Sequence, residues 1–134
     1  MNDDKKAFLS RYRNNEALIA RLAKKIERLE EQAYAMRMSD ISGMPRGSNG
    51  VSNYSFIDDK QDIEARIQRL TERGKVYKKE ILEKIDILED TRYADVLELY
   101  FIECCDFADI AKRLNYSERH VRRLYARGID AIEI

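Results

Sequence analysis

The chain has 134 residues with a single proline, and Asp, Glu, Lys and Arg make up 37% of it, against roughly 25% in an ordinary globular domain. Ala, Glu, Lys, Leu and Arg together account for nearly half of the residues, and there are five glycines and no tryptophan. This composition is typical of long, surface-rich helices and argues against an all-β fold. The length limits the chain to one compact domain or a small domain with an appendage, which leaves little room for a large enzyme.

Membrane insertion and export both lack a sequence signal. No apolar run approaches the roughly 18 residues that a membrane-spanning helix needs. The first ten residues carry acidic side chains where a secretory signal would be basic. Cys104 and Cys105 are adjacent, so they cannot build a disulfide framework between distant segments. We therefore expect a folded cytoplasmic protein that makes no membrane contact.

The N-terminal quarter predicts one long helix. Residues Asp3 to Met38 contain no glycine and no proline. Residues alternately four and three apart form a coiled-coil-like heptad seam over four repeats. The seam consists of Phe8, Tyr12, Asn15, Ile19, Leu22, Ile26, Leu29, Ala33 and Met36.

A loop and a second long helix follow. Residues 39–57 are rich in Gly, Ser and Asn and hold the only proline, so we expect a mobile loop there. From about Asp58 to Asp90 a second proline-free run predicts a helix of similar length. An antiparallel helical hairpin over residues 1–90 is the simplest packing of the two.

Two seam positions leave alternatives open. Asn15 either pairs with a polar partner inside the seam and fixes its register, or lies on a frayed outer turn in water. Gly74, in the seam of the second helix, costs about 1 kcal/mol relative to Ala. It either permits a close helix crossing or is a tolerated surface glycine.

Apolar residues crowd together near the end of the second helix, and more of them are present than one partner helix can cover. They are Ile81, Leu82, Ile85, Ile87 and Leu88. We expect a second copy of the protein to cover this surface, which makes the protein a homodimer. The competing explanation is that the C-terminal domain of the same chain folds back over it.

Residues 91–134 predict a small helical domain. Thr91 is placed to cap a helix over 92–103, Asp106 a short helix over 107–114, and Ser117 a last helix from residue 118 to about 132. Asn115 lies in the turn before the last helix, where a positive φ is commonly needed. A short helix, a tight turn and a capped helix form a helix-turn-helix pattern. The fold prediction is therefore all-α: a long helical hairpin followed by a helix-turn-helix domain.

The predicted core of this domain leaves one face of the last helix free. Ile110, Ala111 and Leu114 are spaced to meet Val121, Leu124 and Ile129. The net charge of the chain is zero, yet the segment from Arg119 to Arg127 has four arginines and no acid. Arginine binds guanine bidentately in the major groove, and glutamate accepts from cytosine. The predicted DNA-contacting residues are Glu118, Arg119, His120, Arg122, Arg123 and Arg127.

The same segment resembles region 4 of the sigma-70 family. The resemblance rests on the acidic-Ile-Ala triplet at Asp109, on the turn that follows, and on the Ser-x-x-x-Val-x-x-Leu pattern that starts at Ser117. With its long N-terminal helices and the Gly-Met-Pro sequence at Gly43, the chain is similar to prophage-encoded transcriptional regulators of the RinA and ArpU type. The resemblance implies promoter contacts by Glu118 and the arginines of the last helix.

The function expected from these observations is a sequence-specific DNA-binding regulator of prophage genes, with double-stranded DNA as partner. The alternative is a helical interaction module that docks on another protein, such as the host RNA polymerase, without touching DNA. One histidine and two cysteines are too few for a structural zinc site, which needs four ligands. A phosphate-binding glycine loop is also missing from the sequence. We therefore expect no metal, no cofactor and no enzymatic activity.

Overall fold

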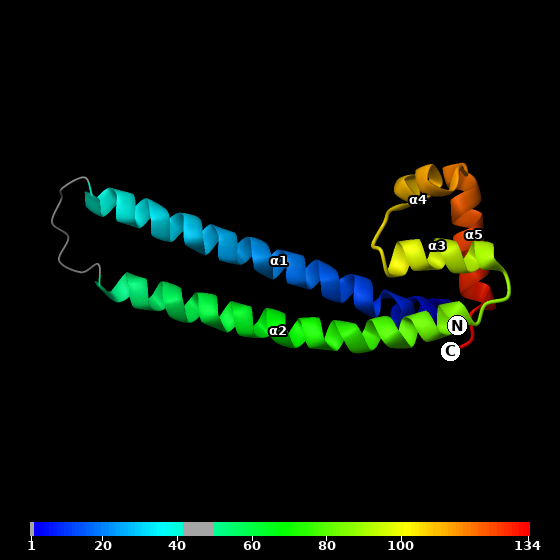
Figure 1. The fold of residues 1–134 in the computed structure, drawn as a ribbon, viewed down its shortest axis with the longest axis horizontal. Helices are drawn as coiled ribbons and strands as arrows, with labels where there is room; N and C mark the ends of the chain where they lie inside the picture. The colour runs from blue at the N-terminus through cyan, green and yellow to red at the C-terminus, as the bar shows by residue number, and fades with distance from the viewer. Residues whose placement is uncertain (1, 42–49) are drawn as a thin grey trace. The chain divides into compact units, whose positions relative to one another are not determined.

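The computed structural model describes residues 2–41 and 50–134, and within them it has five helices and no strand. Two helices are long, α1 (Asn2–Ile41) and α2 (Gly50–Asp86). Three are short, α3 (Thr91–Phe101), α4 (Phe107–Leu114) and α5 (Glu118–Ala131), as Figure 1 shows. The all-α prediction is confirmed.

The packing divides the chain into two compact units. The described parts of Met1–Glu16 and of Arg73–Ile134 form the first unit, and those of Ala17–Glu72 form the second. The first unit therefore contains the start of α1 and the end of α2 together with all three short helices. This division differs from the predicted boundary at residue 90.

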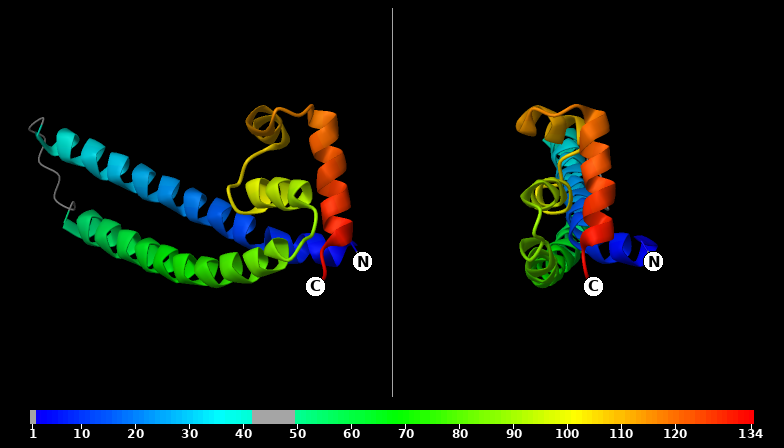
Figure 2. Two further views of the ribbon diagram at one scale, coloured as in Figure 1. Left: turned by 45° about the vertical axis from the view of Figure 1, so that its right-hand side comes forward. Right: turned by 90° about the vertical axis from the view of Figure 1, so that its right-hand side faces the viewer.

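In the second unit, α1 and α2 run side by side in opposite directions (Figures 1 and 2). The seam positions Leu22, Ala33 and Leu70 are buried between them. Lys60 of α2 forms an ion pair with Glu30 of α1, with 2.9 Å between Nζ and Oε1. This pair shows which parts of the two helices face each other. Met36, also assigned to the seam, is 43% exposed.

The ends of the long helices differ from the sequence prediction. Residues 39–41 belong to α1 and residues 50–57 to α2, so the expected loop over 39–57 was too long. Ser and Asn each lower helix propensity by only a few tenths of a kcal/mol, which does not end a helix. The rest of the expected loop, and with it the expected mobility, lies outside the described residues.

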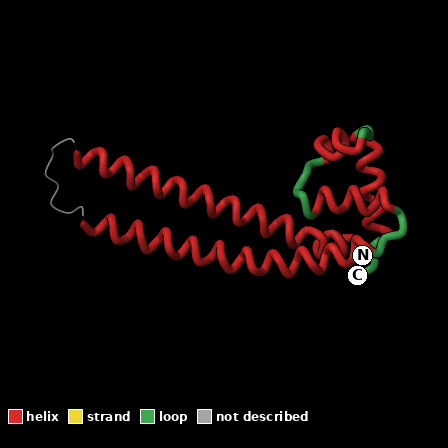
Figure 3. The backbone as a smooth tube through the Cα atoms, in the orientation of Figure 1, coloured by secondary structure: helices red, strands yellow, loops and turns green. Residues whose placement is uncertain are grey.

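The connection between α2 and α3 also begins earlier than expected. Helix α2 ends at Asp86 rather than at Asp90. Asp90 is the N-cap of α3: its backbone is extended and its side chain accepts a hydrogen bond from the Arg92 amide at 3.0 Å. Thr91, the expected cap, is the first helical residue instead. Figure 3 shows this connection and the two others between the short helices as loops.

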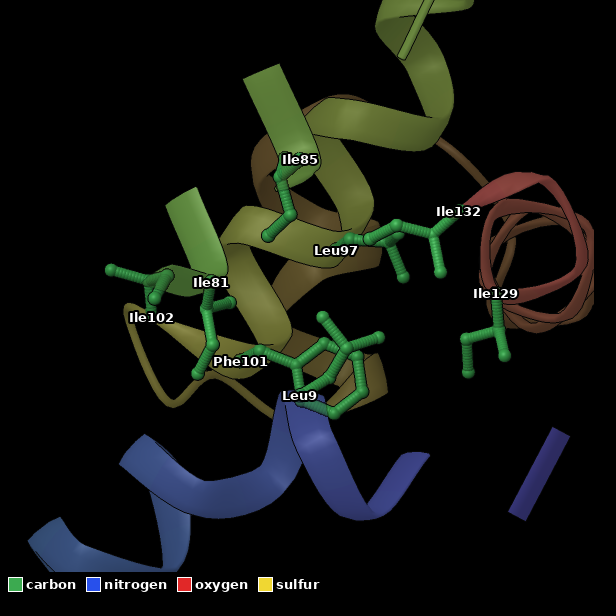
Figure 4. Packing of buried hydrophobic residues seen from close by; sticks show 8 residues of the cluster. All are labelled: Leu9, Ile81, Ile85, Leu97, Phe101, Ile102, Ile129 and Ile132. Carbon is green, nitrogen blue, oxygen red and sulfur yellow. The ribbon is translucent and has the colours of Figure 1, made fainter. Parts of the chain in front are cut away.

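The core of the first unit joins the long helices to the short ones. Leu9 of α1 and Ile81 and Ile85 of α2 are fully buried in one cluster (Figure 4). Their partners come from α3, from α5 and from the residues that follow these helices, namely Leu97, Phe101, Ile102, Ile129 and Ile132. Fully burying each such side chain contributes about 1.5–3 kcal/mol. This cluster makes the base of the hairpin and the short helices one packed body.

This cluster settles what covers the apolar end of α2. The C-terminal helices of the same chain bury Ile81 and Ile85, so the argument that a second copy must cover these residues was wrong. Ile87, counted in the same apolar group, is 67% exposed instead. It lies just past the end of α2, where the chain turns toward α3.

The structure also decides between the alternatives for Asn15 and Gly74. Asn15 is only 6% exposed, so it is a buried seam residue and not part of a frayed turn. A Cβ atom added at Gly74 would lie 2.8 Å from the Asn15 side-chain nitrogen. Real Cβ atoms essentially never come that close to another heavy atom. Gly74 is itself buried and therefore leaves room for the Asn15 side chain between α1 and α2.

Candidate nucleic-acid interface

The helix-turn-helix consists of α4, a turn of three residues and α5. The Asp106 side chain caps α4 by accepting a hydrogen bond from the Asp109 amide at 2.8 Å. The Ser117 hydroxyl caps α5 by accepting from the His120 amide at 3.1 Å. Asn115 ends α4 in the left-handed region, with φ 57° and ψ 43°, a conformation that Asn tolerates better than most residues. Both caps and the turn residue confirm the sequence prediction.

The two helices meet over a small buried core. Ile110 and Ala111 of α4 pack with Val121 and Leu124 of α5, and Val96 of α3 completes the layer. Figure 2 shows that α5 runs across α4 rather than along it. Leu114 lies at the edge of this core, while Ile129, predicted to join it, belongs to the cluster at the base of the hairpin. The core fixes which face of α5 points inward.

A glycine lets α3 and α5 approach closely. A Cβ atom at Gly128 would lie 3.1 Å from Cδ1 of Leu97 and 3.3 Å from Cβ of Tyr93. Such distances are tighter than nearly all real Cβ contacts. Leu97 is fully buried and cannot easily move aside. Gly128 thus helps to position α5, a role that its place in a helix did not reveal from sequence.

Aromatic rings support the inner side of α5. The Tyr125 ring packs against Tyr100, Phe101 and Phe107 at centroid distances of 5.0, 5.7 and 5.2 Å. Burial raises the pKa of the Tyr125 hydroxyl above its ordinary value, so this group stays neutral near pH 7. On the other side of the cluster, the Arg13 guanidinium of α1 lies 4.2 Å from the Tyr100 ring centroid. The ring contacts hold α5 against α3 and α4, and the Arg13 contact links α1 to α3.

The outward side of α5 carries the predicted DNA-contacting residues. Glu118, Arg119, Arg122, Arg123 and Arg127 are all exposed. Among the described residues, none of these five side chains forms an ion pair within 4.0 Å. The structure therefore places four arginines on one helix with their charges available to an external anion.

Arg122 is held in place more firmly than its exposure suggests. Its guanidinium carbon lies 5.2 Å from the centroid of the Phe107 ring, in a cation–π arrangement. Phe107 begins α4, so this contact ties the face of α5 to the start of the preceding helix. This supporting role of Phe107 was not predicted from the sequence. The only available signal was an aromatic residue directly after the Asp106 cap.

His120 is placed differently from the arginines. It is half-buried, and its ring packs edge-on against Tyr116 of the turn, with 4.8 Å between the centroids. Its backbone amide is the one that Ser117 caps. His120 therefore braces the turn, whereas the five charged side chains face outward.

The acidic, histidine and cysteine side chains of the described residues were predicted to hold no metal ion. No group of three or more His, Cys, Asp or Glu side chains in the described ranges is arranged to hold a metal ion. Cys105 is buried, and Cys104 is exposed with φ 57°. Partial burial of the Cys104 sulfur raises the pKa of its thiol, which disfavours the reactive thiolate. None of the described helices has a stretch that is long and apolar enough to cross a bilayer.

Comparison with known families agrees with this geometry. Residues 90–132 match the family described as Sigma-70, region 4. The match begins at the Asp90 cap and covers α3, α4 and α5. No similarity to a curated protein or to a solved structure was found. The match supports a sigma-factor-like helix-turn-helix, which is a DNA-binding domain that acts in transcription.

Proposed function

We propose that the protein is a sequence-specific transcriptional regulator that reads duplex DNA with α5. The observation that carries this proposal is the exposed arginine face of a helix that is capped, preceded by a tight turn and fixed from behind by a buried core. A recognition helix enters the major groove with its N-terminal residues toward the bases. The side chains required for base recognition lie at that end of α5.

Each residue of the face has a role that suits its chemistry. Arg119, Arg122 and Arg123 can each donate two hydrogen bonds to guanine O6 and N7, and Glu118 can accept from cytosine N4. Arg127 lies further along the helix, where phosphate contact is expected. His120 contributes mainly by bracing the turn.

The proposal extends to the setting of the protein. A long helical hairpin ahead of the helix-turn-helix fits the resemblance to prophage regulators of the RinA and ArpU type, so prophage genes are the proposed targets. A cytoplasmic location and a binding role without catalysis belong to the same proposal.

A homodimer remains part of the proposal, although the apolar end of α2 no longer supports it. One arginine face makes few phosphate contacts, and two linked copies would read paired half-sites with higher affinity. Because α3 and α5 already bury Ile81 and Ile85, the interface has to use another surface. Sedimentation equilibrium of the full chain at micromolar concentrations tests this. A monomer throughout that range would exclude the dimer.

The second candidate is a protein-interaction module that docks on RNA polymerase. The zero net charge of the chain favours it, because DNA-binding domains usually carry a basic excess. The two candidates differ in how salt affects binding. A DNA reader loses affinity steeply with rising salt, since each neutralised phosphate releases counterions.

Binding of the full chain to duplex DNA from its own upstream region tests the proposal. Fluorescence anisotropy at several salt concentrations, with a scrambled duplex as control, measures affinity and sequence preference together. We expect preferential binding of the upstream duplex and a steep loss of affinity with salt. Equal binding to both duplexes, or no binding to either, would contradict the proposal.

A further inference from the structure

A second basic surface lies on α1 and α2 within the second unit. A groove of about 360 Å³ runs between α1 and α2 there. Two leucines and four cationic residues line it, with no carboxylate among them: Leu18, Leu22, Arg21, Lys25, Arg28 and Arg66. We call this surface the basic groove.

The sequence of both helices explains why the groove is basic. Residues 17–26 of α1 contain three cationic side chains and no acid, and residues 65–71 of α2 contain two more and again no acid. The ion pair of Lys60 with Glu30 fixes an antiparallel register in which these two segments face each other. The pairing of these two acid-free segments brings Arg21, Lys25 and Arg66 to the groove, and Arg28 joins them from the next turn of α1.

The cations of the groove lack internal counter-charges. Among the described residues, Arg21, Lys25, Arg28 and Arg66 form no ion pair, and all four are exposed. Two other cations of the long helices do pair with acids: Lys60 pairs with Glu30, and Arg11 pairs with Glu80 at 2.7 Å. What sets the groove apart is that its lining combines four cations with no carboxylate, whereas opposite charges alternate on an ordinary solvated face.

The arrangement of these cations fits an extended polyanion. Arg21, Lys25 and Arg28 follow one another at spacings of four and three residues, so they lie on one face of α1 and span about 10 Å of its length. Arg66 adds a guanidinium from α2 across the groove. Guanidinium groups bind phosphate bidentately, and a row of cations suits the regular charges of a nucleic-acid backbone better than it suits one small anion.

We propose that the basic groove binds the phosphate backbone of duplex DNA, as a contact separate from the reading of bases by α5. The inference rests on the proposed function in that the ligand is the same kind of molecule. It also explains how a chain with zero net charge could bind DNA, because the groove adds four cations to the four arginines of α5. The groove adds affinity that does not depend on base sequence.

Charge-removing variants of the full chain test this proposal. The groove variant combines Arg21→Gln, Lys25→Gln and Arg28→Gln. The control variant combines Lys6→Gln, Arg37→Gln and Lys79→Gln, which removes the same charge from exposed positions of α1 and α2 that do not line the groove. Gln is a good helix former, so both variants should keep their helicity, which circular dichroism checks.

The measured quantity is the slope of the logarithm of the duplex affinity against the logarithm of the salt concentration. This slope is negative, and each lost phosphate contact reduces its magnitude by about 0.9 for B-form DNA. We expect the magnitude of the slope to be smaller by about 2 to 3 in the groove variant, and its affinity at low salt to be at least about tenfold weaker. Its preference for the upstream duplex over a scrambled one should stay unchanged, and the control variant should behave like the wild type.

The outcomes separate this inference from the proposed function. If the wild-type protein binds with a steep salt dependence but without sequence preference, base reading by α5 is contradicted. The groove proposal is then still tested by comparing the groove variant with the control variant. A groove variant that matches the control variant overturns the groove proposal and points to an acidic protein surface as the groove's partner. Absence of any duplex binding by the wild type overturns both.

Discussion

Two glycines make room for side chains of the helices packed against them. Gly74 meets Asn15 between the long helices, and Gly128 meets Leu97 and Tyr93 between α3 and α5. A glycine inside a helix costs about 1 kcal/mol relative to alanine. At both positions the structure supplies the compensating reason, because a side chain of the neighbouring helix already lies where a Cβ atom would be.

A double-mutant cycle tests the contact between Gly74 and Asn15. When Asn15 is present, the methyl group added by Gly74→Ala meets the Asn15 amide. This contact should cancel the gain in helix propensity of about 1 kcal/mol that the substitution would otherwise bring. In an Asn15→Ala background the methyl has space, so the same substitution should be more favourable. Coupling between residues in contact is typically about 0.5–3 kcal/mol. Urea denaturation of the four proteins measures it, and additive effects would contradict the proposed contact.

Other residue-scale features could be recognised from sequence only in part. The turn position of Asn115 and the caps Asp106 and Ser117 follow from local backbone chemistry, so they were predictable. The placement of His120 against Tyr116 and of Arg122 over Phe107 was not, because it depends on side-chain packing across the turn. The basic groove had a signal in the two acid-free segments, but only the pairing of α1 with α2 brings them together.

At the element scale, the start of α3 shows how one cap moves a boundary. Asp90 accepts hydrogen bonds from the Arg92 amide and from the Arg92 guanidinium. Thr91 was the sequence prediction for this position because Thr also caps helices, although Asp is at least as good a cap. The same helix-forming composition on both sides of residue 90 hid the true end of α2.

The Asp90 cap predicts an acid dependence of stability. The hydrogen bond from the Arg92 side chain holds the pKa of Asp90 below its ordinary value. A carboxyl with a lowered pKa in the folded state stabilises the protein above its unfolded pKa and loses this contribution as the pH falls through the folded value. Asp90→Asn retains a capping side chain but cannot ionise.

We therefore expect the wild type to be more stable than Asp90→Asn near pH 7, and this advantage to shrink as the pH falls below 4. Thermal denaturation of both proteins from pH 7 to pH 3 measures the difference. An advantage that is constant or grows toward low pH would contradict the role of the charged cap.

The cap of α5 gives a second test at this scale. Ser117→Ala removes the oxygen that accepts from the His120 amide and should cost about 0.5–2 kcal/mol of stability. Ser117→Asp restores an acceptor at the same position and should recover most of the loss. Equal stability of the wild type and Ser117→Ala in urea denaturation would show that the cap contributes nothing.

At the scale of the whole molecule, the compact unit that carries α5 includes the ends of α1 and α2. Periodicity predicted the hairpin and the helix-turn-helix correctly but could not show that they share a core, because that depends on contacts between residues distant in sequence. Ile81 and Ile85 looked like an exposed surface from sequence alone. The structure shows them as the base on which the DNA-binding domain is built.

Truncation of Ile85 tests this shared core. Ile85→Ala should cost about 2–5 kcal/mol, because the residue is fully buried. It should also reduce hydrogen-exchange protection in α5, since Ile129 and Ile132 lie in the same cluster. Ile87→Ala, at a largely exposed position, should change stability by no more than about 0.5 kcal/mol. Unchanged protection of α5 in Ile85→Ala would contradict the shared core.

The proposed function depends on base reading by the arginine face of α5. The most direct measurement compares the specificity ratio, upstream against scrambled duplex, for the wild type, for Arg122→Ala with Arg123→Ala, and for the control Arg37→Ala with Lys79→Ala. Each bidentate arginine contact contributes about 1–3 kcal/mol of discrimination, so the double variant should lose at least about 30-fold in the ratio. The control should keep it. An unchanged specificity ratio in a folded double variant of Arg122 and Arg123 would contradict base reading by α5.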